Sequence, residues 1–204
     1  MKLKPIHQKI FDRAKPYLRT RDNLTHVGIS LRYALKLLAH ESGDEDVVIP
    51  AILLHDVGWK MIPEDLHLTA FGPNPSNPKL GRVHEVEGAK MARSILEGLS
   101  YPPEKVREIC RLILGHDSRK HPISRNDRIV KDADKLWRYS RRGFHIDLER
   151  FSISRRKALL FLEEKIEEWF FLPTARLLAR KELAQRKKEW RPSRQLLRGE
   201  KWKK

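Results

Sequence analysis

The sequence predicts an all-α fold. Apolar residues recur at helical spacings of three and four over most of the 204 residues. Proline and glycine cluster between these stretches and separate them into individual helices. No stretch has the alternation typical of a strand, and no internal repeat is visible. We therefore expect a helical bundle.

Composition narrows the class of protein. Hydrophobic residues make up 40% of the chain, enough for one domain with a substantial core. No run of about 18 apolar residues occurs, which excludes a membrane span, and the N-terminus lacks the apolar core of a signal peptide. Cys110 is the only cysteine. No internal disulfide can form, and we expect a cytoplasmic protein with no membrane partner.

Positive charge is concentrated at the C-terminal end. The formal net charge is +16, and residues 173–204 carry +9 of it through twelve Lys or Arg and three Glu. This segment predicts either contact with nucleic acid or another polyanion, or a solvated helix face that ends in a frayed terminus. Residues 191–204 are expected to form a basic, flexible tail.

Two helices are expected early in the chain, over residues 24–43 and 44–58. The first has one apolar stripe, and the second should end at Gly58. In the second, the aliphatic run AILL leads directly into His55 and Asp56. A buried helix would therefore present an imidazole and a carboxylate together in its last turn.

The middle of the chain is interrupted. Residues 62–83 contain four prolines and two glycines, which forbids a long helix. An irregular segment of this length in a compact domain is typical of a lid or a mobile loop. Helical patterns then resume in four stretches, at residues 84–99, 104–116, 127–139 and 154–188.

Six ionisable residues fall on or beside the apolar stripes of these helices. They are His26, His55, Asp56, His84, His116 and Asp134. Burying so many polar groups without a shared partner would be costly, so a metal centre between the helices is the natural explanation. Imidazole and carboxylate ligands suit iron, manganese, zinc or nickel, and the lack of thiolates argues against a structural zinc site. Six ligands exceed one tetrahedral ion and suit two metals that share a carboxylate.

These residues lie in motifs that resemble those of a known family. His26 lies in NLTHVGIS, the His55–Asp56 pair in AILLHDVG, and Asp134 in VKDADKLW. In this order they resemble the HD-domain superfamily of metal-dependent phosphohydrolases. GRVHEVEGAKMA and LILGHDSRK are similar to motifs of its dinuclear members, and PTARLLARKELAQRKKEW is similar to the closing helix of some bacterial members. The resemblance implies an HD-type domain over residues 1–190, with its core at about 20–145 and closing helices at about 150–190.

The resemblance also implies a ligand set. His26, His55, Asp56 and Asp134 would bind one divalent metal ion, and Asp56 would bridge to a second ion held by His84 and His116. Iron or manganese is expected, with zinc, nickel, cobalt or magnesium as alternatives. In KDADK, residues two apart on a helix point about 200° away from each other, so only one aspartate can face the site. The apolar stripe and the family pattern favour Asp134, and Asp132 is expected to cap or pair at the surface.

The implied reaction is hydrolysis of a phosphoester or phosphoanhydride bond in a nucleotide-type substrate. A metal-bound hydroxide would attack phosphorus, because coordination lowers the pKa of water toward about 7. Asp56 and Lys60 are the expected catalytic residues, and Lys60, Arg119 and Lys135 are expected to neutralise the phosphate. All three cations are also compatible with a solvated surface position. The chain lacks the GYP signature of the cyclic-dinucleotide phosphodiesterases, and their lysine would fall at Trp59.

Two other functions fit the same residues. Some members of the superfamily use a mixed-valence di-iron pair with these ligand types to activate O₂, so an oxygenase is one alternative. A nucleic-acid-binding protein with a non-catalytic metal site is the other, because of the basic C-terminal segment. Neither the exact substrate nor the oligomeric state is predicted by the sequence.

Overall fold

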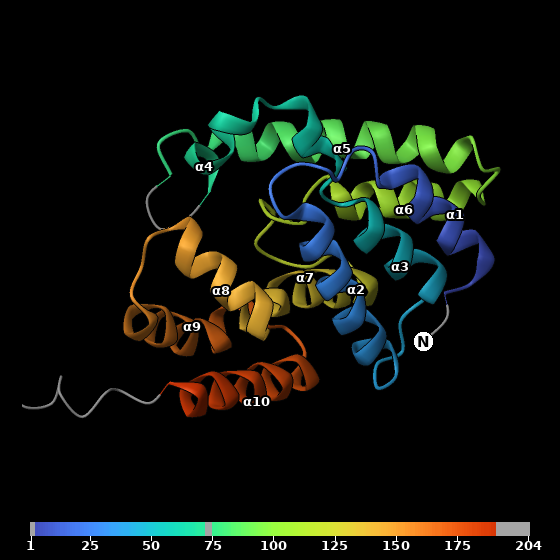
Figure 1. Ribbon diagram of the computed structural model, residues 1–204. Helices are drawn as coiled ribbons and strands as arrows, with labels where there is room; N and C mark the ends of the chain where they lie inside the picture. Colours follow the sequence, from blue (N-terminus) through green and yellow to red (C-terminus); the bar gives the residue numbers. More distant parts are fainter. Residues whose placement is uncertain (1–2, 72–74, 191–204) are drawn as a thin grey trace, which may run out of the picture.

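The computed structural model describes residues 3–71 and 75–190 (Figure 1). These residues form helices and turns with no strand among them, which confirms the predicted all-α fold. The helices are α1 (Pro5–Ala14), α2 (Asn23–Leu38), α3 (Glu45–Leu54), α4 (His67–Ala70), α5 (Lys79–Glu97), α6 (Pro103–Ile113), α7 (Arg125–Leu136), α8 (Arg141–Arg150), α9 (Arg155–Trp169) and α10 (Pro173–Glu189). Three 3₁₀ helices complete the set: η1 (Val57–Met61), η2 (Glu64–Leu66) and η3 (Trp137–Tyr139). The predicted tail, residues 191–204, lies outside the described residues.

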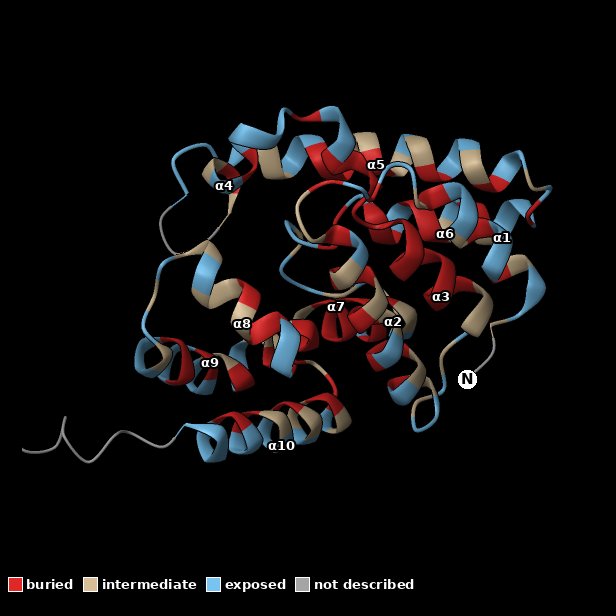
Figure 2. Cartoon of the chain, viewed as in Figure 1, coloured by how far each residue is buried: buried red, intermediate tan, exposed pale blue. Residues whose placement is uncertain are grey.

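Helix α3 is the centre of the fold. Every residue from Val47 to Leu54 is buried, and α1, α2, α6 and α7 pack around this helix (Figure 2). Because no face of α3 from Val47 onward meets water, its sequence is apolar on all sides rather than striped. The residues that follow α3 therefore lie in the interior of the bundle.

One hydrophobic core joins the whole bundle. It runs from Ile10 in α1 to Leu183 in α10, and α9 and α10 pack against each other below α7 and α8 (Figure 1). None of the described helices combines the length and the apolar character that crossing a membrane requires.

Several predicted helix boundaries are wrong: α2 ends at Leu38 rather than near Gly43, α6 ends at Ile113, and the stretch 154–188 is divided into α9 and α10. The two that matter most for the fold are the end of α3 and the start of α5. Helix α3 stops at Leu54 instead of Gly58, because the ring Nδ1 of His55 bonds the carbonyl of Ile52 at 2.8 Å. That carbonyl would otherwise accept the N–H of Asp56, so the chain leaves the α-helix and enters η1. Helix α5 begins at Lys79, five residues before the predicted start, directly after Pro78. The segment predicted as an irregular loop thus contains η2, α4 and the first turn of α5.

Gly58 has a different role from the predicted helix stop. It lies within η1 at the point where this turn crosses α5. A Cβ atom added there would lie 2.0 Å from the carbonyl oxygen of His84 and 2.5 Å from the backbone nitrogen of Gly88. Glycine is required because two backbones approach too closely for any side chain.

Asp132 was expected at the surface, and that expectation is wrong. Its side chain is fully buried and accepts hydrogen bonds from the backbone N–H groups of Phe171, at 3.0 Å, and Leu172, at 2.8 Å. Burial raises the pKa of this carboxyl to about 7, although the two N–H groups oppose the rise. Asp132 does act as a cap, but of the buried entry to α10 rather than of a solvated helix end.

Replacing Gly58 by alanine should destabilise the protein. The new methyl group must push η1 away from α5, and overpacking of this kind costs about 1–3 kcal/mol of unfolding free energy. Urea denaturation measures the change. Gly28→Ala is the matched control, because nothing lies within 4 Å of a Cβ added at that helical position. Equal stabilities of the two variants would contradict the close approach.

Replacing Asp132 by alanine should loosen the start of α10. The N–H groups of Phe171 and Leu172 would lose their acceptor while remaining largely buried, at a cost of about 1–3 kcal/mol. Hydrogen exchange should then be faster for amides of α10 than in the wild type. The exposed Asp12→Ala serves as a control, and unchanged exchange at α10 in Asp132→Ala would refute the capping role.

Candidate metal centre

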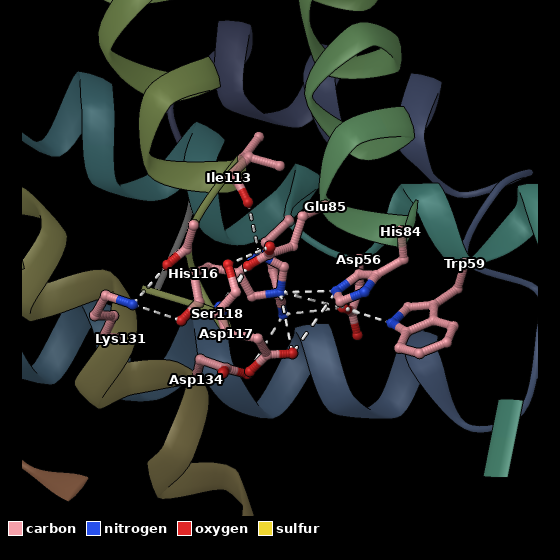
Figure 3. Close-up of polar contacts among 12 residues, drawn as sticks. Asp56, Trp59, His84, Glu85, Ile113, His116, Asp117, Ser118, Lys131 and Asp134 are labelled. Atoms are coloured by element: carbon pink, nitrogen blue, oxygen red, sulfur yellow. Dashed lines mark hydrogen bonds and ion pairs between the residues drawn. The ribbon is translucent and has the colours of Figure 1, made fainter. Parts of the chain in front are cut away.

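The structure brings the six predicted ligands together. Figure 3 labels four of them, Asp56, His84, His116 and Asp134. They come from different elements: His26 from α2, His55 and Asp56 from the turn after α3, His84 from α5, His116 from the turn after α6, and Asp134 from α7. None of the six is more than 7% exposed. Residues from distant parts of the sequence therefore meet at one buried point.

The histidines form two pairs that face each other through Nε2. The Nε2 atoms of His26 and His55 are 2.8 Å apart, and those of His84 and His116 are 3.1 Å apart. Asp134 belongs to the first pair, because its Oδ1 lies 3.1 Å from His26 Nε2 and 3.4 Å from His55 Nε2. The centre therefore has two halves.

Asp56 lies between the two halves. Its Oδ2 is 3.5 Å from His26 Nε2, and its Oδ1 is 3.7 Å from both His55 Nε2 and His116 Nε2. The same Oδ1 is 3.8 Å from His84 Nε2. A single carboxylate thus contacts all four imidazoles, which is the arrangement expected of a group shared by two sites.

Asp117 joins the second half and was not predicted. Its Oδ2 lies 3.6 Å from His116 Nε2 and 3.7 Å from His84 Nε2, and its side chain is 44% exposed. A signal for it exists in the sequence: the stretches I-L-L-H-D, ending at Asp56, and I-L-G-H-D, ending at Asp117, share the pattern I-x-x-H-D. The second His-Asp pair repeats the first.

The two His-Asp turns are built in the same way. The Nδ1 of His116 bonds the carbonyl of Ile113 at 2.8 Å, just as His55 bonds Ile52. Because a carbonyl only accepts, each Nδ1 carries the proton and each Nε2 presents a lone pair to the centre when the ring is neutral. Metal-binding histidines are usually oriented by such a bond.

Buried charges hold the second turn in place. Glu85 Oε1 accepts the backbone N–H groups of Asp117, at 2.9 Å, and Ser118, at 2.8 Å. From the other side, the ammonium of Lys131 donates to the carbonyls of Gly115 and His116, both at 2.7 Å. Figure 3 shows both groups around this turn. They fix the backbone that carries His116 and Asp117.

Trp59 supports the centre from η1. Its Nε1 donates to Asp56 Oδ1 at 3.0 Å, and its ring stacks on His84 with a centroid distance of 4.2 Å and an interplanar angle of 13°. His67 Nε2 in turn donates to the carbonyl of Trp59 at 3.1 Å. Trp59 thus orients the carboxylate of Asp56 and the imidazole of His84.

Burial and neighbouring charges shift the pKa values of the centre in opposite directions. Burial lowers the pKa of His84 to about 4, so this ring is neutral at pH 7. Burial also opposes the charge on His116, but Asp117 and Asp56 outweigh it and raise the pKa of His116 to about 9. For Asp56, burial is outweighed by His55 and His116, and the pKa of the carboxyl lies well below its usual range. At pH 7 the Asp56 carboxylate is therefore ionised and His84 is neutral, whereas His116 carries a proton that a bound metal ion would have to displace.

The residues fit divalent metal ions. Ligands at about 2.0–2.2 Å from one ion lie roughly 3.0–3.6 Å apart. The distances from Asp134 to His26 and His55, 3.1 Å and 3.4 Å, lie in this range, and the His26–His55 distance of 2.8 Å is slightly shorter. Within the described residues, the buried Nδ1 atoms of His26 and His84 have no hydrogen-bond partner. The orientation of these two rings is therefore set by packing and by the contacts of their Nε2 atoms. A divalent ion between two facing Nε2 atoms would take the place of the proton that they share in its absence.

A cleft opens above the centre. Its volume is about 350 Å³, and His26, Asp56, His84, Asp117 and Asp134 lie in its lining. Five cationic side chains also line it: Arg21, Arg82, Lys135, Arg138 and Arg150. The cleft is thus lined by five cations and three carboxylates. Because the cations outnumber the carboxylates, the cleft favours an anionic ligand.

Arg21 is the most constrained of these cations. Its guanidinium carbon lies 4.4 Å from the ring centroid of Trp59 and 4.7 Å from that of Phe71. Burial lowers its pKa to about 10, which still leaves the group charged at neutral pH. Aromatic rings that contact a guanidinium hold its plane and leave its N–H edge for an anionic ligand.

Of the three predicted phosphate-binding cations, only Lys135 reaches the cleft. Lys60 is exposed at the end of η1, outside the cleft lining, because the 3₁₀ turn directs Trp59 inward in its place. Arg119 turns away as well, and its Nη2 donates to the buried Asp127 at 2.9 Å. The four arginines that line the cleft were not predicted from the sequence, because nothing in their local pattern marks them.

Comparison with known proteins identifies one family. A family model described as HD domain matches residues 23–139, which is more than half of the chain. The match begins at the start of α2 and ends at the last residue of η3, so it contains all seven acidic and imidazole residues of the centre. No curated protein and no solved structure matches the chain.

Metal binding should stabilise the protein. A ligand that binds only the folded state adds about 2.7 kcal/mol at one hundred times its Kd. We expect the melting temperature to rise with added Mn²⁺ or Fe²⁺ and to fall with a chelator. Asp56→Asn should abolish most of this response, whereas Asp65→Asn, on the exposed η2, should keep it. An Asp56→Asn protein with an unchanged metal response would contradict the central position of Asp56.

Proposed function

The chain belongs to the HD-domain family, and from that premise we propose that it hydrolyses a phosphoester or phosphoanhydride bond of a nucleotide-type substrate. Membership implies the metal-dependent phosphohydrolase superfamily, whose domains bind divalent metals. The proposal rests on one observation: five cations line the same cleft as the imidazoles and carboxylates of the centre. A phosphorylated substrate presents the negative charge that these cations select.

The proposed metal ligands follow the two halves of the centre. His26, His55 and Asp134 would hold one ion, His84, His116 and Asp117 would hold the other, and Asp56 would be shared between them. Iron or manganese suits this nitrogen and oxygen donor set best. When bound, the ions supply a water molecule of lowered pKa and positive charge for the phosphate.

Lys135 has a double role in this proposal. Its ammonium lies 2.6 Å from Asp117 Oδ1 and 3.1 Å from Asp134 Oδ2, so it holds one carboxylate from each half. Asp117 and Asp134 raise its pKa against the effect of burial, and it stays charged. An ammonium has three donors, which leaves one for a phosphate oxygen.

Arginines at the rim would bind the remaining phosphate oxygens. Arg82 is anchored through Nη1, which donates to Glu85 Oε2 at 2.7 Å, and its other donors are free to reach the cleft. Arg150 contacts the rings of Phe71 and Trp137 at 5.8 Å and 5.7 Å. Guanidinium groups fixed in this way bind phosphate bidentately with little loss of side-chain entropy.

A neighbouring apolar pocket supports a nucleoside as the rest of the substrate. This pocket, of about 440 Å³, lies between α8 and α9 and shares Lys135 and Arg138 with the cleft. Phe151, Phe161 and Trp169 are among its lining residues. A substrate with its phosphate between the cations could place a flat base against these rings.

The alternatives predict different chemistry from the same residues. A di-iron oxygenase would use the same ligand types, but five cations around the cleft favour an anionic substrate over a neutral one. Oxygen consumption measured beside phosphate release separates the two. For a nucleic-acid-binding protein, random RNA should bind in a salt-dependent way that deletion of residues 173–204 abolishes, with no turnover.

Asp56→Ala should remove activity. Loss of the shared carboxylate should lower bound metal in the purified protein and reduce phosphate release from a nucleotide panel by more than about a hundredfold. Elemental analysis and a phosphate assay measure both effects. Asp65→Ala, on the exposed η2, is the control. If Asp56→Ala retains both metal and hydrolysis, the proposed mechanism is wrong.

Phe161→Ala should weaken recognition of the base. Losing a ring from the apolar pocket should raise KM for a good nucleotide substrate by about tenfold, as the burial free energy of an aromatic side chain implies. The KM for glycerol phosphate, which has no base, should not change. Leu160→Ala, at a neighbouring exposed position that does not line the pocket, is the matched control. Equal effects on both substrates would place the nucleoside elsewhere.

A further inference from the structure

A second cationic pocket lies between α2, α8 and α10. Its volume is about 560 Å³, and it shares no lining residue with the cleft of the metal centre. Five lysine or arginine side chains line it, from three helices: Arg32 and Lys36 from α2, Arg141 and Arg142 from α8, and Arg186 from α10. Glu182 is the one carboxylate among its lining residues. The local charge is strongly positive.

Four of these cations are exposed and lack an ion pair. Within residues 3–71 and 75–190, no carboxylate lies within 4.0 Å of the charged groups of Arg32, Lys36, Arg141 or Arg142. Like charges that converge without counter-charges raise the free energy of the fold unless an anion joins them.

Arg186 is the buried member of the group. The residue is 3% exposed, and its Nη2 donates to Glu189 at 3.1 Å. Its Nε and Nη1 are buried and have no hydrogen-bond partner among the described residues. Buried guanidinium donors left unsatisfied are costly, and this side chain lines the pocket. Its Nη2 also lies 3.9 Å from Glu182, so Arg186 and Glu182 together fix the inner wall of the pocket, and the four exposed cations are left for an anion.

The N-terminus of α8 opens into the same pocket. Ser140 caps this helix of ten residues, and Arg141 and Arg142 occupy its first turn, which contains no acidic residue. Cations are unfavourable at this end of a helix, where the backbone N–H groups already attract anions. His145 lies beside these arginines, with its Nδ1 2.7 Å from the Arg141 carbonyl and its Nε2 3.1 Å from Arg155.

We propose that this pocket binds the phosphate of a small phosphorylated molecule, at a site separate from the metal centre. Guanidinium groups match the geometry of phosphate oxygens. The buried Arg186 gives the inner wall of the pocket a fixed position. A phosphate could also come from a nucleic-acid backbone. The pocket volume is within the range of small-molecule sites, which favours a free phosphorylated compound.

Calorimetric titration with methylenediphosphonate, which is not hydrolysed, tests the proposal on the full-length, metal-loaded protein. We expect two classes of site in the wild type. The double variant Arg141→Gln/Arg142→Gln should weaken one class by about tenfold and leave the other unchanged. Arg82→Gln, at the rim of the cleft, should weaken only the other class. Circular dichroism and melting temperature show whether each variant is folded.

A charge-matched control separates a built site from general basicity. Lys9→Gln/Arg13→Gln removes the same two charges from exposed positions on α1 and should leave both classes unchanged. Equal weakening in this control, or a single class of site that responds only to Arg82→Gln, would overturn the proposal. One further outcome would also overturn the proposal: methylenediphosphonate does not bind the pocket, but a random oligonucleotide binds in a way that requires Arg141 and Arg142. Loss of hydrolysis in Asp56→Ala would leave these outcomes unaffected, because the pocket lies outside the cleft.

Discussion

The centre depends on one local interaction that occurs twice: an imidazole Nδ1 that bonds the carbonyl three residues earlier in the chain. At His55 and His116 this bond ends a buried helix, fixes the tautomer of the ring, and directs Nε2 inward. It also places the next residue, Asp56 or Asp117, beside the same imidazoles. One hydrogen bond therefore sets the direction of two ligands, and two such turns face each other across the centre.

The packing of the bundle follows from the need to bury these turns. Helix α3 is apolar on every side from Val47 onward, because its end must lie where α2, α5, α6 and α7 can reach it. The turn after it can approach α5 only because Gly58 has no side chain. That approach stacks Trp59 on His84 and links the two halves of the centre. A close backbone crossing is thus a condition for the geometry of the ligands.

The sequence predicted the helices and the six converging residues, because both depend on periodic patterns and on motifs with recognisable order. What it missed depends on local departures from the α-helix and on tertiary contacts. Lys60 was expected at the phosphate because it lies next to the position of a lysine in related enzymes, and the 3₁₀ turn directs Trp59 to the cleft instead. Asp117 was missed although the repeated I-x-x-H-D pattern marks it, because the side chain is 44% exposed and only the matching hydrogen bonds of the two turns show that they are built alike. Arg21 and Arg150 join the cleft from segments far apart in the sequence, with no local pattern to mark them.

Helix α7 connects the centre to the closing helices. Asp134 and Asp132 are two residues apart and point to opposite sides of this helix, the first toward His26 and the second toward the start of α10. Helix α10 also carries Arg186, and α8, which follows α7 through η3, carries the other cations of the second pocket. A displacement of α10 that broke the Asp132 cap would therefore act on the same helix that positions Asp134. The two anion-attracting regions share no lining residue, but both take residues from α2 and α8: His26 and Arg150 line the cleft, and Arg32 and Arg141 line the second pocket. A shift of either helix would therefore change both regions.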